Sequence, residues 1–278
     1  MKVENPSLRL FGDAIQAIQP PLEISDGDQA VYNIYLKGIQ ALGAGRLIDA
    51  SMEFSKILNG DSLFTLKMLA ALGFIESVVN QESLDRTVAL ISQAQVYRGN
   101  IVNSSEFTQL PLLEQAAFCT QSAILFYELN DIEITRKDCA TAVEHLNVFS
   151  YPTPEPNRKN LVLATAFLFQ GLSAAPKQVT KDTKVTCETA INSFDQASAF
   201  FLLVDNHAGE IISLLWRGIL RKDLYSIVEE ESKKIELVKS SQADLMAVIQ
   251  IAEENNEFAQ YANMANTTLA QLPQGFQS

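Results

Sequence analysis

The chain has 278 residues, of which 47% are hydrophobic and 19% charged, so it can bury a sizeable core and does not have a disordered composition. Its formal net charge is −12 at pH 7, and an acidic surface repels nucleic-acid phosphates and anionic lipid headgroups. Because no apolar run is long enough to span a bilayer either, we expect neither a nucleic-acid partner nor membrane insertion.

Residues 1–27 form a leader in which Pro6 and the pair Pro20 and Pro21 bracket a short amphipathic stretch. The apolar residues that share one face at helical spacing are Leu8, Phe11, Ile15 and Ile18. We expect a helix that caps the first hairpin, and a detachable arm is the alternative. The leader has no apolar core of signal-peptide length, which predicts a cytoplasmic protein.

Small and large residues alternate in residues 31–58 at the spacing of two interlocking antiparallel helices. Gly38 and Ala50 lie on opposite arms and let the helices approach closely, and Phe54 fills the space toward the next pair. We predict that Gly45 lies in the turn that reverses the chain, because glycine adopts a positive φ without steric cost. Ala41 and Ile57 complete the pattern.

Two more hairpins are predicted between residues 62 and 150. The polar stretch 98–111 is interpreted as a loop between them, and Asn130 with Asp131 as a tight turn. Residues 117–127 are apolar on nearly all sides, which is typical of a helix buried between neighbours.

Alternating prolines in residues 151–157 interrupt the helical pattern, because proline cannot continue a helix. We expect a rigid kink inside one continuous stack, and a domain boundary is the alternative. Hairpins follow in residues 158–272, with a closing pair after a break expected near Lys239 and Gln242. Residues 273–278 form a tail.

The fourth hairpin repeats the pattern of the first. Ala190, Phe194 and Ala197 show the same spacings of four and three as Ala50, Phe54 and Ile57. With its recurring hairpins, the chain resembles the tetratricopeptide-repeat superfamily, whose unit is about 34 residues long. The match is best in residues 31–58 and is fair in residues 158–202.

This resemblance implies an all-α, right-handed superhelix of about five antiparallel helix pairs, covering residues 28–150 and 158–272 with a polar cap at the end. It also implies a non-catalytic adaptor, or a subunit of a larger protein assembly, that binds a partner segment on the inner face of the scaffold. A regulatory sensor that binds a small molecule or peptide in the superhelical groove is the alternative. The acidic charge favours a basic or apolar protein segment as partner.

Two sets of residues are candidates for the partner contact. Tyr32, Tyr35 and Ile39 share one face of the first helix, where tyrosines offer apolar area and a hydroxyl group. Packing against the leader would explain the same pattern. Arg217 and Arg221, four residues apart, are suited to a partner carboxylate, and a solvated edge is the alternative.

No pattern of catalytic, metal-binding or cofactor-binding residues is evident. The three cysteines, Cys119, Cys139 and Cys187, show no CxxC spacing and are predicted to be small buried hydrophobes in a reducing compartment. The only histidines are His145 and His207. Phosphate-loop, dinucleotide and HExxH motifs are missing from the sequence. We therefore expect no enzyme activity, no metal and no cofactor.

Overall fold

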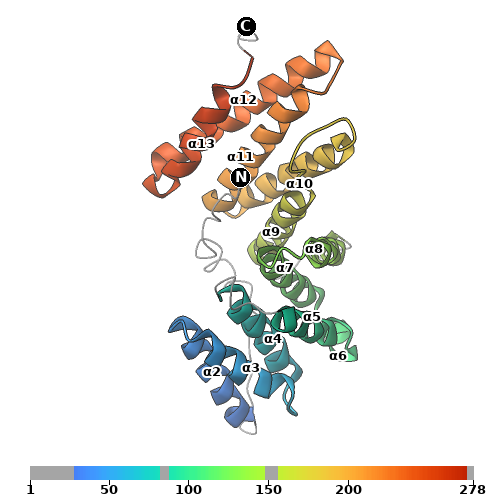
Figure 1. The fold of residues 1–278 in the computed structure, drawn as a ribbon, viewed down its shortest axis with the longest axis vertical. Helices are drawn as coiled ribbons and strands as arrows, with labels where there is room; N and C mark the ends of the chain where they lie inside the picture. The colour runs from blue at the N-terminus through green and yellow to red at the C-terminus, as the bar shows by residue number, and fades with distance from the viewer. Residues whose placement is uncertain (1–27, 82–87, 148–155, 274–278) are drawn as a thin grey trace. The chain divides into compact units, whose positions relative to one another are not determined.

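The computed structural model describes residues 28–81, 88–147 and 156–273. Every regular element in these ranges is a helix and no strand occurs in them (Figure 1), which confirms the predicted all-α class. The leader 1–27, residues 151–155 of the proline-rich segment and residues 274–278 of the tail lie outside the described residues. Within the described residues, no helix combines the length and the hydropathy needed to cross a bilayer.

The described chain divides into two compact units between Asp138 and Cys139, inside α8 (Ile132–Asn147). We call residues up to Asp138 the N-terminal unit and those from Cys139 the C-terminal unit. The other helices of the N-terminal unit are α2 (Gln29–Gly43), α3 (Leu47–Leu58), α4 (Phe64–Val79), α5 (Val88–Val102), α6 (Ser105–Gln109) and α7 (Leu112–Glu128). The C-terminal unit contains α9 (Pro156–Ala174), α10 (Lys184–Leu203), α11 (His207–Tyr225), α12 (Glu231–Glu254), the short 3-10 helix η2 (Asn256–Phe258) and α13 (Ala259–Leu269).

Consecutive helices pack against each other in both units. In the N-terminal unit, α3 packs against α2 and α4, α2 also contacts α4, and α4 packs against α5 and α7. In the C-terminal unit, α10 packs between α9 and α11, and α12 packs against α11 and α13. This neighbour-to-neighbour packing is what a chain of helical hairpins requires.

The first hairpin closes over the ring of Phe54, as the spacing predicted. A Cβ atom added to Gly38 on α2 would lie 2.6 Å from the Phe54 ring, and one added to Gly73 on α4 would lie 2.5 Å from it. Only glycine therefore lets α2 and α4 approach this fully buried side chain. Gly45 has a φ of 71° in the turn, which confirms its predicted role in reversing the chain.

The C-terminal unit repeats this contact. A Cβ atom added to Gly171 on α9 would lie 2.8 Å from the ring of Phe194 on α10, and one on Gly209 of α11 would overlap the ring of Phe201. Ala190 and Ala197 are buried beside Phe194, as Ala50 and Ile57 are beside Phe54. The recurrence in the sequence therefore corresponds to one recurring way of packing a phenylalanine on a glycine.

Helix α7 is the most completely enclosed element of the N-terminal unit. Every residue from Gln115 to Phe126 is buried, which confirms the expectation for the apolar segment. The chain leaves α7 through the predicted turn, where Asn130 has a φ of 61°. Asp131 then accepts a hydrogen bond from the amide of Ile134 at 3.1 Å and so begins α8.

The predicted loop over residues 98–111 is wrong. Helix α5 continues to Val102, and α6 (Ser105–Gln109) follows after two residues. Ser104 caps α6, because its hydroxyl accepts a hydrogen bond from the Phe107 amide at 3.1 Å. Phe107 is buried and its ring packs edge-on against Phe118, with centroids 5.5 Å apart. Within this polar stretch, Ser104 therefore caps a helix, and the neighbouring Phe107 anchors that helix in the core.

The predicted break near Lys239 is also wrong, because α12 runs unbroken from Glu231 to Glu254. Ser241 lies at the expected break and is fully buried. Its hydroxyl donates a hydrogen bond of 2.8 Å to the carbonyl of Gly218 on α11, so this polar group is satisfied inside the helix pair. The turn falls earlier, at residues 226–230, after α11 has continued to Tyr225.

Candidate binding site

The predicted site residues on α2 occupy two different environments. Tyr32 is half-buried and Ile39 is 39% exposed, and Leu36, between them on the same side of the helix, is 37% exposed. Tyr35 is only 8% exposed. Its ring lies between that of Tyr32, with centroids 6.2 Å apart, and that of Phe54, with centroids 6.0 Å apart.

We call Tyr32, Leu36 and Ile39 the tyrosine surface. Tyr35 lies beneath this surface and connects it to the core of the hairpin. Among the predicted residues, Tyr32 and Ile39 therefore offer contact area, whereas Tyr35 supports them from below. Partner binding through these residues stays a prediction.

The sequence reasoning did not single out Glu76. It is a half-buried residue of α4, the helix that packs beside α2. Burial raises the pKa of the Glu76 carboxyl. Burial and, after it, the charge of Glu76 raise the pKa of Tyr35 to about 12. The signal in the sequence was a carboxylate near the end of an otherwise apolar segment, ALGFIESVV.

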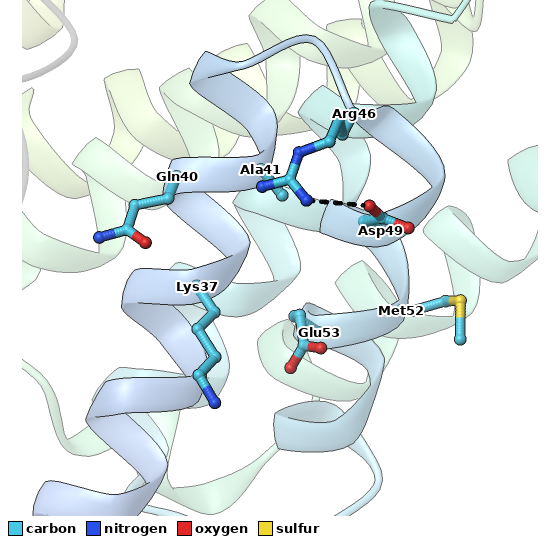
Figure 2. A pocket seen from close by; sticks show the side chains of 7 residues that line it. All are labelled: Lys37, Gln40, Ala41, Arg46, Asp49, Met52 and Glu53. Carbon is cyan, nitrogen blue, oxygen red and sulfur yellow. Dashed lines mark hydrogen bonds and ion pairs between the residues drawn. The ribbon is translucent and has the colours of Figure 1, made fainter.

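A groove opens on the other side of α2, between it and α3 (Figure 2). Lys37 lines this groove, and it lies about 200° around the helix from Ile39, because successive residues turn by about 100°. We call this feature the hairpin groove; its volume is about 250 Å³. Its lining residues are Lys37, Gln40, Ala41, Arg46, Asp49, Met52 and Glu53.

The charges of the hairpin groove are largely satisfied within the chain. Arg46 pairs with Asp49 at 3.3 Å, and Glu53 pairs with Lys56 at 2.6 Å. Lys37 takes part in no salt bridge with the residues that the structure describes. The groove therefore offers one cation and little enclosed apolar surface.

Arg217 and Arg221 lie on α11 and face two carboxylates of the neighbouring helices. Arg217 contacts Asp195 of α10 at 2.5 Å and Asp244 of α12 at 2.5 Å. Arg221 contacts the same Asp244 at 2.5 Å and Asp195 at 3.3 Å. Burial disfavours the charge of Arg217, but its hydrogen bond to Asp244 and the two carboxylate charges outweigh burial and raise its pKa. This quartet supports a structural role, and contact of the arginines with a partner stays a prediction.

The quartet leads to a stability prediction. Replacing Asp244 with asparagine should lower the free energy of unfolding by roughly 2–3 kcal/mol, because charged hydrogen bonds to two arginines are weakened together. Denaturant unfolding measures the change. Asp205→Asn is the control, since the Asp205 side chain is 91% exposed. Unchanged stability of Asp244→Asn combined with lost partner binding would show that the arginines serve a partner instead.

The cysteines are buried and free, as predicted. Burial raises the pKa of the Cys119 thiol, and it raises that of Cys187 to about 12. Both thiols therefore stay protonated near neutral pH, where they are poor nucleophiles. In the described part of the chain, no three histidine, cysteine or acidic side chains gather as they would to hold a metal ion.

Comparisons of the chain with protein-family models, with curated proteins and with solved structures find no match. The function must therefore be argued from the residues and their contacts. The tetratricopeptide-like superhelix, the partner and the lack of catalysis are accordingly proposals.

Proposed function

We propose that the chain is a non-catalytic, protein-binding adaptor or a subunit of a larger assembly. Its helix pairs stack as a tetratricopeptide-like superhelix, and the tyrosine surface on the inner side of α2 binds a basic or apolar segment of a partner. The observation that carries this proposal is the tyrosine surface itself, in which Tyr32, Leu36 and Ile39 keep contact area on one side of α2.

The chemistry of this surface suits a protein partner. Aromatic residues are enriched where proteins meet, because a rigid ring buries a large area at a small cost in conformational entropy. The stacking of Tyr32 on the buried Tyr35 holds the outer ring in place. A surface that is ordered before binding loses less entropy when a partner arrives.

The recurring phenylalanine–glycine contact supports the repeat architecture. It joins α2, α3 and α4 around Phe54, and α9 and α10 around Phe194. When a hairpin buries its large side chains against the adjacent hairpins, stacking the hairpins on one another stabilises the fold. The hairpin groove, at about 250 Å³, is slightly smaller than the range of about 300–1,000 Å³ that is typical of small-ligand pockets.

The proposal predicts a selective loss of binding. Once affinity purification from the native source has identified the partner, the double variant Tyr32→Ala with Ile39→Asp should bind it at least about tenfold more weakly, a loss of about 1.4 kcal/mol. Its melting temperature should stay close to wild type, because both side chains are partly exposed. Titration calorimetry and thermal unfolding measure the two quantities.

The matched control is Lys37→Ala, on the opposite side of the same helix. It should leave the partner's affinity unchanged. If Lys37→Ala abolished partner binding while the double variant retained it, the partner would bind in the hairpin groove. That result would contradict the proposal.

A further inference from the structure

The chain leaves α3 through Asn59 and Gly60, the only asparagine–glycine pair in the sequence. Asn59 is exposed and follows directly after the last residue of α3. An asparagine that precedes glycine deamidates most readily, because glycine has no Cβ atom to keep its backbone nitrogen away from the asparagine side chain. The most reactive dipeptide of this kind therefore lies outside a helix and in contact with water.

Long hydrogen bonds hold this pair in place. The Gly60 amide donates to the carbonyl of Ile57 at 3.3 Å, and the Ser62 hydroxyl donates to the same oxygen at 3.3 Å. The Asn59 Nδ2 atom donates to the Tyr97 hydroxyl at 3.2 Å. Hydrogen bonds from N–H to oxygen are most often about 2.9–3.0 Å long. We therefore expect this turn to open more readily than α3 itself.

An open turn allows the Gly60 nitrogen to attack the side-chain carbonyl carbon of Asn59. A bond forms between these two atoms, the bond from that carbon to Nδ2 breaks, and Nδ2 leaves as ammonia with the proton of the Gly60 amide. Water then opens the cyclic imide at either carbonyl, which gives aspartate or isoaspartate. The hydrogen bond to Tyr97 opposes the first step, because it restrains the side chain that must move and holds the nitrogen that must leave.

We propose that Asn59 deamidates spontaneously in the folded protein and that the Tyr97 hydroxyl controls the rate. Tyr97 is buried on α5, and its ring packs edge-on against Phe74 of α4 with centroids 4.9 Å apart, so its hydroxyl is fixed in position. The same hydroxyl accepts a second hydrogen bond, from Gln93 at 2.8 Å. This modification site does not depend on the partner proposed above.

Deamidation should weaken the joint between α3 and its neighbours. Both products put a carboxylate at the C-terminal end of α3, where the helix dipole disfavours a negative charge. Isoaspartate also inserts an extra carbon atom into the backbone before Gly60, where a Cβ atom would already lie 2.9 Å from the carbonyl oxygen of Lys56. Protein that has reacted should therefore melt below fresh protein, and Asn59→Asp should reproduce part of this loss.

The test follows the full chain during incubation at neutral pH, well below its melting temperature. Trypsin releases residues 57–67, a peptide in which Asn59 is the only asparagine, so the gain in mass of this peptide reports the reaction. Asn103 and Asn192 are internal references, because both are exposed and precede serine. We expect Asn59 to react faster than either, and an isoaspartate-specific methyltransferase to label the peptide, since only the imide gives isoaspartate.

Two variants test the role of the hydroxyl. Tyr97→Phe keeps the ring, and it should speed the reaction at Asn59 roughly two- to tenfold, the effect of losing a hydrogen bond of about 0.5–1.5 kcal/mol. Gln93→Ala is the matched control, because it removes the other partner of the hydroxyl and leaves the bond to Asn59. Its rate should stay close to wild type.

Four results would overturn the proposal. They are a reaction at Asn59 no faster than at Asn103 and Asn192, a product without isoaspartate, and a rate that Tyr97→Phe leaves unchanged. The fourth is an equal acceleration of Asn103 by Tyr97→Phe, because the variant would then act by unfolding the chain rather than by releasing Asn59.

Discussion

Replacing Phe54 with alanine should lower the free energy of unfolding by about 3–5 kcal/mol, the range for truncating a fully buried phenylalanine. The Phe54 ring is 0% exposed and lies against Gly38 and Gly73 and near the Tyr35 ring, so one side chain holds α2, α3 and α4 together. Two glycines face the ring, and neither has a side chain that could move into the cavity. We therefore expect little relaxation. Denaturant unfolding followed by circular dichroism measures the loss.

Two further alanine variants serve as controls for Phe54→Ala. Ile48→Ala, also on α3 but 68% exposed, should change the stability by less than about 0.5 kcal/mol. Phe194→Ala should be as damaging as Phe54→Ala, because Phe194 makes the same contact with a glycine. If Phe54→Ala were as mild as Ile48→Ala, the ring would not be the centre of the first hairpin.

Replacing Arg98 with methionine should lower the free energy of unfolding by about 3–5 kcal/mol, because it leaves a buried charge without its partner. Asp138 of α8 is 0% exposed and Arg98 of α5 is 7% exposed. The Asp138 carboxylate accepts hydrogen bonds from the Nε atom of Arg98 at 3.0 Å, from its Nη2 atom, and from the hydroxyl of Ser122 at 2.6 Å. Methionine keeps most of the apolar stem, so the loss reports the charge.

A double-mutant cycle tests this prediction. Adding Asp138→Leu to Arg98→Met removes both charges, and the double variant should be more stable than Arg98→Met alone. Denaturant midpoints of the four proteins give the coupling energy. Additive losses would contradict a direct, buried interaction between the two side chains.

The sequence predicted the helical class because its patterns are local. Gly38, Gly45 and Phe54 lie within one hairpin, and a single pair of helices explains their spacing. The missed elements depend on contacts with distant residues. Ser241 looks like a break until Gly218 of α11 accepts its hydrogen bond, and Ser104 caps a helix that Phe107 anchors in the core.

The candidate site was only partly predictable for the same reason. Tyr32 and Tyr35 are three residues apart, and periodicity alone does not tell which of them is buried. Arg98 and Asp138 are separated by 40 residues, so their pairing has no local signature. Glu76 could have been noticed as an acid in an apolar helix, but its electrostatic effect on Tyr35 follows from the packing of α4 on α2.

The most direct test of the proposed function is site-specific photocrosslinking in cells of the native source. A benzophenone amino acid is placed at Ile39, on the tyrosine surface, or at Met52, in the hairpin groove; both side chains are exposed. We expect the probe at Ile39 to crosslink one protein. The probe at Met52 should not capture that protein. Crosslinking of the same protein from Met52 but not from Ile39 would contradict binding at the tyrosine surface.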